Sequence, residues 1–298
     1  ADNLKPGYPR WANYVKGVIA NFPSLVVPFK ALIVSSVPIG SGLSSSASLE
    51  VSTFTFLEGL LNTNLGISLQ EKAVICQRAE HLYANVPCGL MDQLITLMGR
   101  ENNALLIDCK SLETQLVEIS DANISFLVCN SKVRHSLADS EYSSRRKVCE
   151  QVAVLLARSS LRDVCMRELE TSKSVLTEQM YSIARHVITE ISRTESAAEA
   201  LKAKDYTVFG TLMTQSHISL RDDYKVSCAE VDELVEITLE CDGVYGSRMT
   251  GAGFGGCTIT LLKSECVNQV IDQIKSKYRG SPDFLIVKPT QGAQFKVL

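Results

Sequence analysis

The sequence has little of what nucleic-acid recognition, membrane insertion or zinc binding requires. Its net charge is −3, so there is no electrostatic reason to expect a nucleic acid or an anionic membrane as partner. Apolar runs such as Ala31–Val34 are far too short to span a bilayer, and residues 1–10 lack the pattern of a secretory signal. The four histidines are scattered without metal-ligand spacing. We therefore expect no nucleic acid, no membrane and no zinc.

The cysteines do not predict a disulfide framework. None of the ten forms a C-x-x-C pair, and a chain of 298 residues is long enough to build a core without disulfides. Most lie among apolar neighbours, as Cys129 does at the end of residues 124–129. We expect reduced, buried cysteines and a cytoplasmic protein.

Hydrophobic periodicity in the first part of the chain predicts alternating helices and strands. Apolar residues recur with helical spacing from Trp11 to Phe22, and Ser68 with Glu71 forms a capping box that opens a further helix. The complete expectation for this part is helices at 11–22, after 46, at 68–84 and at 90–98, with strands at 29–37, 104–108, 115–119 and 124–130.

The second part is predicted to be mainly helical before it returns to strands. We expect helices throughout 141–220, one capped by Ser227 and Glu230 that ends near Cys241, and one at 267–278, with strands at 257–262 and 284–287. This order indicates an α+β fold of two lobes, with an N-terminal lobe of residues 1–130 and a C-terminal lobe of residues 131–298.

A loop between the strand and the helix expected around it, residues 38–46, has the composition of a phosphate site. Gly40 and Gly42 permit a tight backbone path, and the helix that follows presents free N–H groups at its positive end. No Walker A pattern occurs in the sequence. The alternative is a Gly/Ser linker with a serine helix cap.

A second glycine-rich stretch, residues 246–256, contains the spacing G-x-G-x-x-G at Gly251, Gly253 and Gly256. A dinucleotide site needs this pattern after a strand and before a helix, whereas here it follows a helix and opens a strand. That interpretation fails. Close packing of the backbone against a ligand or another loop, and a structural glycine turn, both remain.

Two acidic residues are candidates for chemistry. Asp92 follows a Pro/Gly loop at a helix start, where an aspartate usually caps the helix but can also reach a substrate hydroxyl as a base. Glu80 lies on the preceding helix, where it is either a magnesium ligand or an ordinary surface glutamate.

Together these segments resemble the GHMP kinase superfamily, whose phosphate motif is P-x-x-x-G-L-x-S-S-A. The residues that match this motif position by position are Pro38, Gly42, Leu43, Ser45, Ser46 and Ala47. Within the superfamily, residues 9–17, 42–50, 88–93, 133–137 and 247–251 are similar to galactokinases of the animal type. The similarity covers the chain from about Lys5 onward.

The resemblance implies a fold, a reaction and partners. The fold is two α+β lobes with the active site in the cleft between them. The reaction is transfer of the γ-phosphate of ATP to the anomeric hydroxyl of galactose with Mg²⁺. ATP and galactose are the implied partners, and we expect a monomer.

The resemblance also implies roles for single residues. Asp92 faces the anomeric hydroxyl, Ser46 and Glu80 hold Mg²⁺, and Trp11 lies against the adenine, although its place on an apolar stripe equally fits a core residue. The residues assigned to ATP are Trp11, Gly40, Gly42, Leu43, Ser44, Ser45 and Ser46, and those assigned to the sugar are Cys88, Gly89, Asp92 and Tyr142.

One departure from the family pattern leads to a further expectation. The signature G-R-x-N-L-I-G-E-H-x-D-Y, which supplies sugar ligands in galactokinases, does not occur in this sequence. We expect an N-terminally truncated member with impaired turnover. The alternatives are an N-acetylgalactosamine kinase, a non-catalytic sensor of ATP and galactose, and a protein that keeps only the fold.

Overall fold

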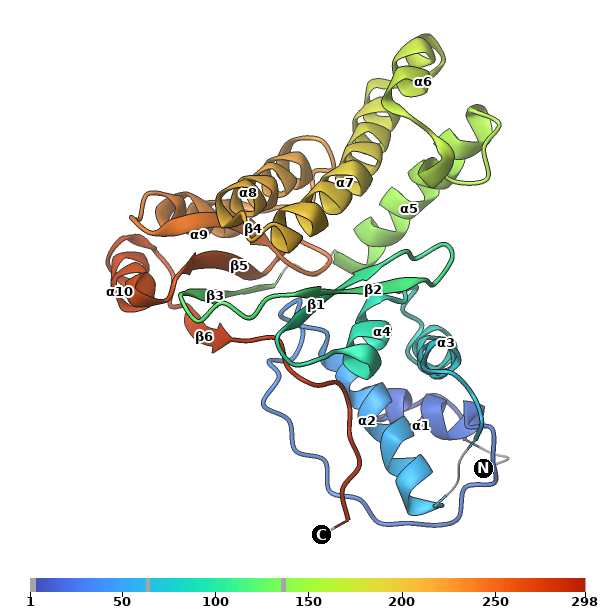
Figure 1. Ribbon diagram of the computed structural model, residues 1–298. Coiled ribbons are helices and arrows are strands. Elements are labelled where there is room, and N and C mark those ends of the chain that lie inside the picture. The colour runs from blue at the N-terminus through green and yellow to red at the C-terminus, as the bar shows by residue number, and fades with distance from the viewer. Residues whose placement is uncertain (1–3, 63–64, 135–137, 298) are drawn as a thin grey trace. The chain divides into compact units, whose positions relative to one another are not determined.

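The computed structural model describes residues 4–62, 65–134 and 138–297, with the backbone alone for residues 134 and 138–142 (Figure 1). The chain forms two compact units, one of Ala1–Ser120 with Pro289–Leu298 and one of Asp121–Lys288. The boundary expected after residue 130 falls inside strand β3 (Ile124–Arg134), which pairs along its length with two strands of the second unit. None of the helices in the described ranges is long and apolar enough to cross a membrane.

The first unit is helical with one hairpin. Its elements are α1 (Ala12–Asn21), α2 (Ser45–Leu60), α3 (Leu69–Ala79), the π-helix η1 (Glu80–Ala84), α4 (Met91–Met98), β1 (Asn103–Ile107) and β2 (Thr114–Glu118). The expected capping box opens α3: Ser68 accepts from the backbone N–H of Glu71, and the Glu71 carboxylate accepts from that of Ser68 at 2.7 Å. Strands were expected at 104–108 and 115–119, and β1 and β2 correspond to them and pair antiparallel.

The apolar faces of the four helices enclose the core of the first unit. Val18, Phe54 and Leu94 come from different helices and are all fully buried. The ring of Phe22 lies 4.9 Å from that of Phe54. Burial of such side chains contributes about 1.5–3 kcal/mol each, so this cluster holds the helices that carry the candidate site residues.

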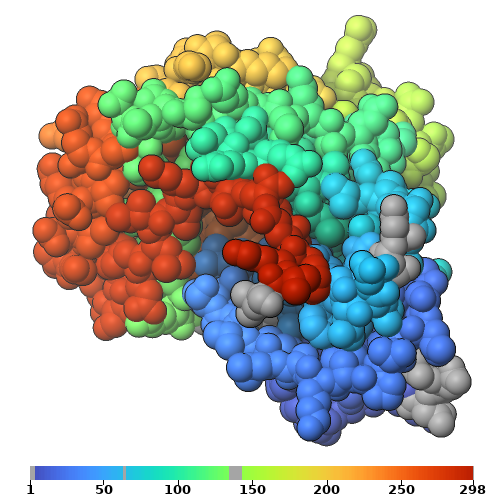
Figure 2. All heavy atoms as spheres, turned by 60° about the horizontal axis from the view of Figure 1, so that its bottom comes forward, coloured from blue at the N-terminus to red at the C-terminus, as the bar shows by residue number. Residues whose placement is uncertain are grey.

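The C-terminal segment packs back onto the first unit (Figure 2). The backbone N–H of Asn102 donates to the carbonyl of Pro289 at 3.1 Å, and that of Gly292 donates to Gly99 at 2.9 Å. A Cβ at Gly59 would lie 2.3 Å from the ring of Phe295, so the small residue on α2 admits this ring.

The strand expected at 29–37 is wrong. The segment is extended, but it pairs with no strand in the described part of the chain, and residues 30–36 are all exposed. Leu32 is 90% exposed. The β-branched composition favours an extended backbone, but a strand also requires a neighbour whose N–H and C=O groups are in reach.

The second unit is a four-stranded antiparallel sheet with helices. The strand order is β4-β5-β3-β6, formed by β4 (Val244–Met249), β5 (Gly255–Lys263), β3 and β6 (Asp283–Val287). The strand β4 was not predicted, because Gly246 interrupts its apolar pattern. A Cβ at Gly246 would lie 1.9 Å from the carbonyl oxygen of Gly210, so glycine lets β4 lie directly against α8 (Tyr206–Asp222).

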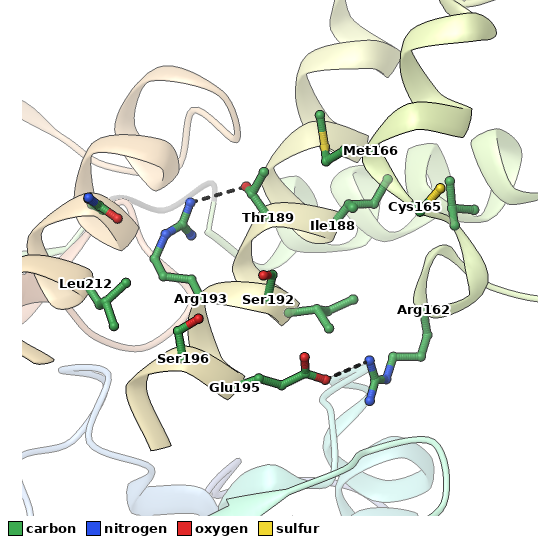
Figure 3. A pocket seen from close by; sticks show the side chains of 13 residues that line it. Arg162, Cys165, Met166, Ile188, Thr189, Ser192, Arg193, Glu195, Ser196 and Leu212 are labelled. Atoms are coloured by element: carbon green, nitrogen blue, oxygen red, sulfur yellow. Dashed lines mark hydrogen bonds and ion pairs between the residues drawn. The ribbon is translucent and has the colours of Figure 1, made fainter. Parts of the chain in front are cut away.

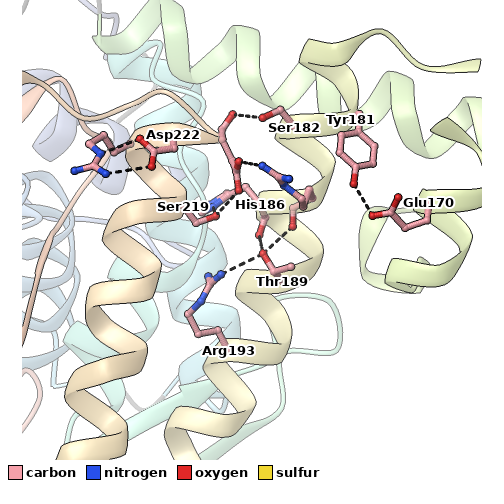
Figure 4. A network of polar contacts seen from close by, with 11 residues as sticks. Glu170, Tyr181, Ser182, His186, Thr189, Arg193, Ser219 and Asp222 are labelled. Atoms are coloured by element: carbon pink, nitrogen blue, oxygen red, sulfur yellow. Dashed lines mark hydrogen bonds and ion pairs between the residues drawn. The ribbon is translucent and has the colours of Figure 1, made fainter. Parts of the chain in front are cut away.

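The helices of the second unit pack on the sheet and on one another. Beyond α8 they are α5 (Ala138–Leu155), α6 (Met166–Thr171), α7 (Glu178–Lys202), α9 (Ala229–Leu239) and α10 (Val267–Lys277), with short 3₁₀ turns η2 (Leu161–Asp163), η3 (Lys173–Val175) and η4 (Ser264–Cys266). Leu127 and Leu262 of the sheet are buried with Leu234 and Ile274 of α9 and α10. Polar contacts join α7 to α8 (Figure 4).

The cap expected at Ser227 for α9 is wrong. The N-cap residue is Cys228, and its side chain makes no capping bond. The Ser227 hydroxyl donates instead to Asp232. The pattern S-x-x-E thus coincides with a helix start here without forming the reciprocal bonds of a capping box.

Candidate active site

The loop before α2 turns sharply because three of its residues adopt left-handed backbone conformations. Gly40 has φ 64°, Gly42 has φ 80°, and the non-glycine residue Ser44 has φ 57°. The buried hydroxyl of Ser41 donates to the carbonyl of Pro38 at 2.9 Å and closes the turn. The loop therefore delivers the chain into α2 through a compact path with little side-chain bulk.

The start of α2 lacks the ordinary serine cap. Ser44 occupies the N-cap position, but its side chain makes no capping hydrogen bond, and its left-handed backbone differs from the extended one of a usual cap. Among the described residues, no hydrogen bond engages the backbone N–H groups of Ser45, Ser46 or Ala47. Free N–H groups and the positive end of a 16-residue helix form an anion-binding geometry.

Two carboxylates and one amide are buried together beneath this turn. Glu50 lies on α2 and is 0% exposed, Glu80 begins η1 and is 4% exposed, and Gln93 on α4 is 1% exposed. The side-chain nitrogen of Gln93 donates to Oε2 of Glu50 and to Oε2 of Glu80, each at 3.0 Å. Three elements distant in sequence thus meet at one amide.

Burial dominates the ionisation of this cluster. Loss of water raises the pKa of Glu50 to about 9, and the neighbouring charge of Glu80 adds to the effect. Burial also raises the pKa of Glu80, while hydrogen bonds from Cys88 and Ser46 oppose the rise. Near neutral pH the Glu50 carboxyl therefore keeps its proton.

The cluster leaves hydrogen-bonding capacity unused. Within the described residues, Oε1 of Glu50 and Oε1 of Gln93 are buried without a hydrogen-bond partner. Buried acceptors of this kind are uncommon, and a bound water, an ion or a catalytic role usually accounts for them. Because Glu50 stands on α2, the helix that follows the glycine loop, these two unpaired oxygens belong to the candidate site.

The oxygen ligands suited to Mg²⁺ are Ser46 and Glu80. Ser46 acts on the pKa of the Glu80 carboxylate, so the two side chains named from the sequence lie near each other. No group of three or more His, Cys, Asp and Glu residues in the described part could hold a metal on its own. Mg²⁺ keeps several waters and is commonly held by one or two protein ligands plus substrate phosphates, so this small donor set fits it.

Asp92 is the second residue of α4, and it does not cap that helix. The N-cap position is Leu90, with no side-chain capping bond. Among the described residues, the half-buried Asp92 carboxylate makes no hydrogen bond or ion pair, and its charge acts on Glu50 and Glu80. A partially exposed carboxylate without a protein partner is available to a substrate hydroxyl.

The loop before α4 is held by side chains of the preceding helical turn. The carbonyl of Cys88 accepts from Gln77 at 3.1 Å and contacts Nε2 of His81 at 2.9 Å, and its thiol lies 3.3 Å from Glu80. Gly89 is exposed. Cys88 thus contacts Glu80, and the expected role of Cys88 and Gly89 in a sugar pocket stays a prediction. The side chain of Tyr142 lies outside the described residues.

Trp11 is not a core residue. It precedes α1, whose buried apolar residues begin further on, and it is 54% exposed. The alternative of a core tryptophan is therefore wrong. Its exposed ring leaves a flat aromatic surface that the packing of the first unit does not use.

Glu50 and Gln93 were missed from the sequence. Glu50 stands on α2 among apolar residues, where a fully buried acid is unusual, and this position was the available signal. Gln93 directly follows Asp92 but gives no sign of its partners, which lie 43 and 13 residues away in sequence.

The glycine-rich loop of the second unit packs against the backbone at Val226. The N–H of Phe254 donates to the carbonyl of Val226 at 2.7 Å. Gly253 has φ 96°, and a Cβ there would lie 2.2 Å from the same carbonyl oxygen. Of the interpretations left open for this loop, close packing against another segment is the one that the structure contains.

A surface cavity of about 560 Å³ lies in the second unit, over α7 (Figure 3). Its charged residues satisfy one another: Arg162 pairs with Glu195 at 3.3 Å, and Arg193 donates to Thr189 at 3.2 Å. None of the site residues predicted from the sequence lines it.

The chain matches two family models. Residues 13–100 match the GHMP kinases N terminal domain, and residues 197–280 match the GHMP kinases C terminal domain. The galactokinase of Homo sapiens is 53% identical over 98% of this chain and 74% of its own length. That of Clostridium acetobutylicum is 41% identical over 95% of this chain and 76% of its length.

Solved structures show the same similarity. The galactokinase of Lactococcus lactis complexed with galactose has a TM-score of 0.90 and 31% identity, over 98% of this chain and 78% of that one. A Streptococcus pneumoniae phosphomevalonate kinase has a TM-score of 0.64 at 12% identity, which is a likeness of fold alone.

Proposed function

We propose that this chain, which belongs to the galactokinase family of the GHMP kinases, transfers the γ-phosphate of ATP to the anomeric hydroxyl of galactose. The observation that carries the proposal is the Asp92 carboxylate, which has no protein partner in the described residues. It lies next to Gln93 of the buried cluster, and Glu50 of the same cluster stands on α2, the helix whose start lacks a side-chain cap. The Lactococcus lactis relative, solved with galactose, supports the choice of sugar.

The first part of the proposal concerns ATP. The backbone of Gly40, Gly42 and Leu43 leads into the serines Ser44–Ser46, whose N–H groups and hydroxyls would line the polyphosphate. The free N–H groups of the first turn of α2 support this assignment. The exposed ring of Trp11 would stack on the adenine.

Ser46 and Glu80 would hold Mg²⁺. The ion neutralises charge on the phosphates when bound. The protein's own contribution is to place the buried Glu80 carboxylate near the Ser46 hydroxyl, where little water reaches the acid. Most of the catalysis of phosphoryl transfer is positioning and charge stabilisation of this kind.

Asp92 would orient the sugar hydroxyl and accept its proton. As the hydroxyl oxygen bonds to the γ-phosphorus, the bond from that phosphorus to the bridging oxygen breaks, ADP leaves, and the proton passes to the carboxylate. Cys88 and Gly89, fixed between Glu80 and Asp92, would shape the sugar pocket together with Tyr142.

A coupled assay of ADP release tests this function. We expect release from ATP and Mg²⁺ to depend on galactose and to be at background with no sugar. A preference for N-acetylgalactosamine would redirect the assignment to that substrate, and sugar-independent release would contradict it.

We further propose a cytoplasmic monomer. All ten cysteines are free, including the exposed Cys109 and Cys165, which suits a reducing compartment. Light scattering after size-exclusion chromatography measures the oligomeric state, and a mass near 32.7 kDa is the expected result.

A further inference from the structure

We infer that Gln93 is a positioning residue that fixes the Glu80 carboxylate for Mg²⁺ and anchors the turn that carries Asp92, an inference that rests on the proposed function. The Gln93 side chain is almost fully buried and comes from α4. The amide does not titrate and is not proposed to touch the substrate. It acts through Glu80 and Asp92, the two acids to which the proposal gives the chemistry.

The geometry commits both hydrogens of the amide. The nitrogen of Gln93 donates at 3.0 Å to Glu50 on α2 and at 3.0 Å to Glu80 at the start of η1. A primary amide has two N–H donors at a fixed angle, so two simultaneous bonds leave the side chain one orientation. The amide thus sets the separation of α2, η1 and α4 at this point.

The contacts on Glu80 converge on one oxygen. Oε2 accepts from the amide of Gln93 and from the thiol of Cys88, which lies 3.3 Å away. Neither of these two contacts uses the other oxygen. A carboxylate held by one oxygen keeps a fixed plane, which is the condition for presenting its remaining lone pairs to a metal.

A neutral amide suits this task better than the alternatives. A lysine or arginine would also bond to Glu80, but it would neutralise the carboxylate and compete with the cation. A glutamate would add a third buried acid, and an asparagine is one methylene too short to span both acceptors. Gln93 fixes the Glu80 carboxylate and leaves its charge for Mg²⁺.

Gln93 also adjoins Asp92 in the first turn of α4. Because the amide ties this turn to α2 and η1, it constrains the backbone that carries Asp92. A network with only a structural purpose is expected to satisfy its acceptors. Here the buried Oε1 atoms of Gln93 and Glu50 have no hydrogen-bond partner among the described residues.

The test is a Mg²⁺ titration of ATP binding by calorimetry on the unchanged chain and on Gln93→Met, which keeps the length of the side chain and removes both donors. We expect the Mg²⁺ concentration for half-maximal ATP binding to rise tenfold or more, as is usual when a group orienting a metal ligand is lost. ATP affinity in EDTA should change less than about twofold, since the phosphate loop is untouched.

The matched control is Thr53→Val. Thr53 lies on the same helix as Glu50, is 8% exposed, and donates to the carbonyl of Leu49 at 2.7 Å. This variant removes a buried hydroxyl without reaching the cluster, so its Mg²⁺ dependence should equal that of the unchanged chain. Gln93→Asn replaces Gln93→Met if the latter does not fold, and the same shift is expected.

A double variant separates positioning from general destabilisation. In a Glu80→Gln background the residue that Gln93 positions is already neutral, so adding Gln93→Met should shift the Mg²⁺ dependence by less than about twofold. An unchanged Mg²⁺ dependence in folded Gln93→Met overturns the inference and leaves the proposed function standing. Absence of Mg²⁺-dependent ATP binding in the unchanged chain overturns both.

Discussion

Both units hold shielded carboxylates between helices, but the pair Glu50 and Glu80 of the first unit lacks, among the described residues, the cationic partner that Lys72 gives to Glu58 and that arginines give to acids of the second unit. In the second unit, Asp223 accepts from Arg185 and from Ser219, and Glu190 pairs with Arg193 and with Arg248. In the first unit, the described residues place no arginine or lysine in hydrogen-bond contact with the cluster of Glu50, Glu80 and Gln93, whose donors are neutral amide, thiol and hydroxyl groups.

The difference teaches which acids are structural. A buried acid paired with a guanidinium recovers its lost hydration within the protein, whereas an unneutralised one costs stability unless a ligand supplies the missing charge. We interpret the second network as part of the packing of α7 on α8. The first is prepared for a cation, and Asp92 beside it for a substrate hydroxyl.

The largest expected effect comes from Asp92→Asn. The amide cannot accept the proton of the sugar hydroxyl, so the rate of galactose-dependent ADP release should fall about 10³-fold. ATP affinity should stay within about threefold, since the phosphate loop is intact. Glu101→Gln, an exposed acid just past α4, is the control and should leave both unchanged. A loss of less than tenfold would exclude Asp92 as the base.

The next expected effect is a pH dependence that belongs to the second unit. Burial lowers the pKa of His186 from 6.5 to about 4 in the folded state. As the pH falls through this interval, the unfolded state binds a proton at this histidine more readily than the folded state does, so the folded state loses stability. The lost contribution is up to about 3 kcal/mol. His186→Asn should flatten the slope. Hydrogen exchange of the α7 amides measures this dependence of stability on pH. The same dependence in His186→Asn as in the unchanged chain would contradict its assignment to His186.

Asp223→Ala should break the compensated network. Removing the acid leaves Arg185 without its ion-pair partner and leaves Ser219 with His186 alone, and we expect a loss of about 2 kcal/mol in the free energy of unfolding of the second unit. The neighbouring Asp222→Ala is the matched control, because Asp222 is 54% exposed and pairs only at the surface with Arg221. Its effect should stay below about 1 kcal/mol. ATP affinity should change in neither variant. A weaker ATP affinity in Asp223→Ala would contradict the interpretation that the network around Asp223 is only structural.

The smallest expected effect comes from Trp11→Ala. Loss of stacking on the adenine should weaken ATP binding about fivefold, while the melting temperature stays nearly constant because the ring is 54% exposed. Tyr8→Ala, at an aromatic residue that is 84% exposed, is the control and should leave binding unchanged. Equal ATP affinity in Trp11→Ala would remove the adenine role.

Much of the fold was predictable because helix patterns are local. The capping box of Ser68 and Glu71 and the apolar stripe ending at Phe22 both correspond to elements of the structure. The failures required knowledge of a neighbour. The segment 29–37 has the composition of a strand but no partner among the described residues, and β4 is a strand despite Gly246 because α8 lies against it.

The candidate site was predictable where a motif is continuous in sequence. The loop of Gly40 and Gly42 has the tight backbone path expected from its glycines, while the binding roles of Ser46 and Glu80 stay predictions. The part that could not be predicted is the buried support. Gln93 gains its meaning from two acids on other elements, and burial rather than sequence spacing raises their pKa values.

Phosphorus-31 NMR of the chain incubated with ATP, Mg²⁺ and galactose tests the central claim most directly, because it identifies the oxygen that receives the phosphate. The account predicts a sugar 1-phosphate signal that grows in step with ADP and is absent when position 92 is asparagine. A signal from a phosphate on another sugar hydroxyl, or from inorganic phosphate alone, would contradict it.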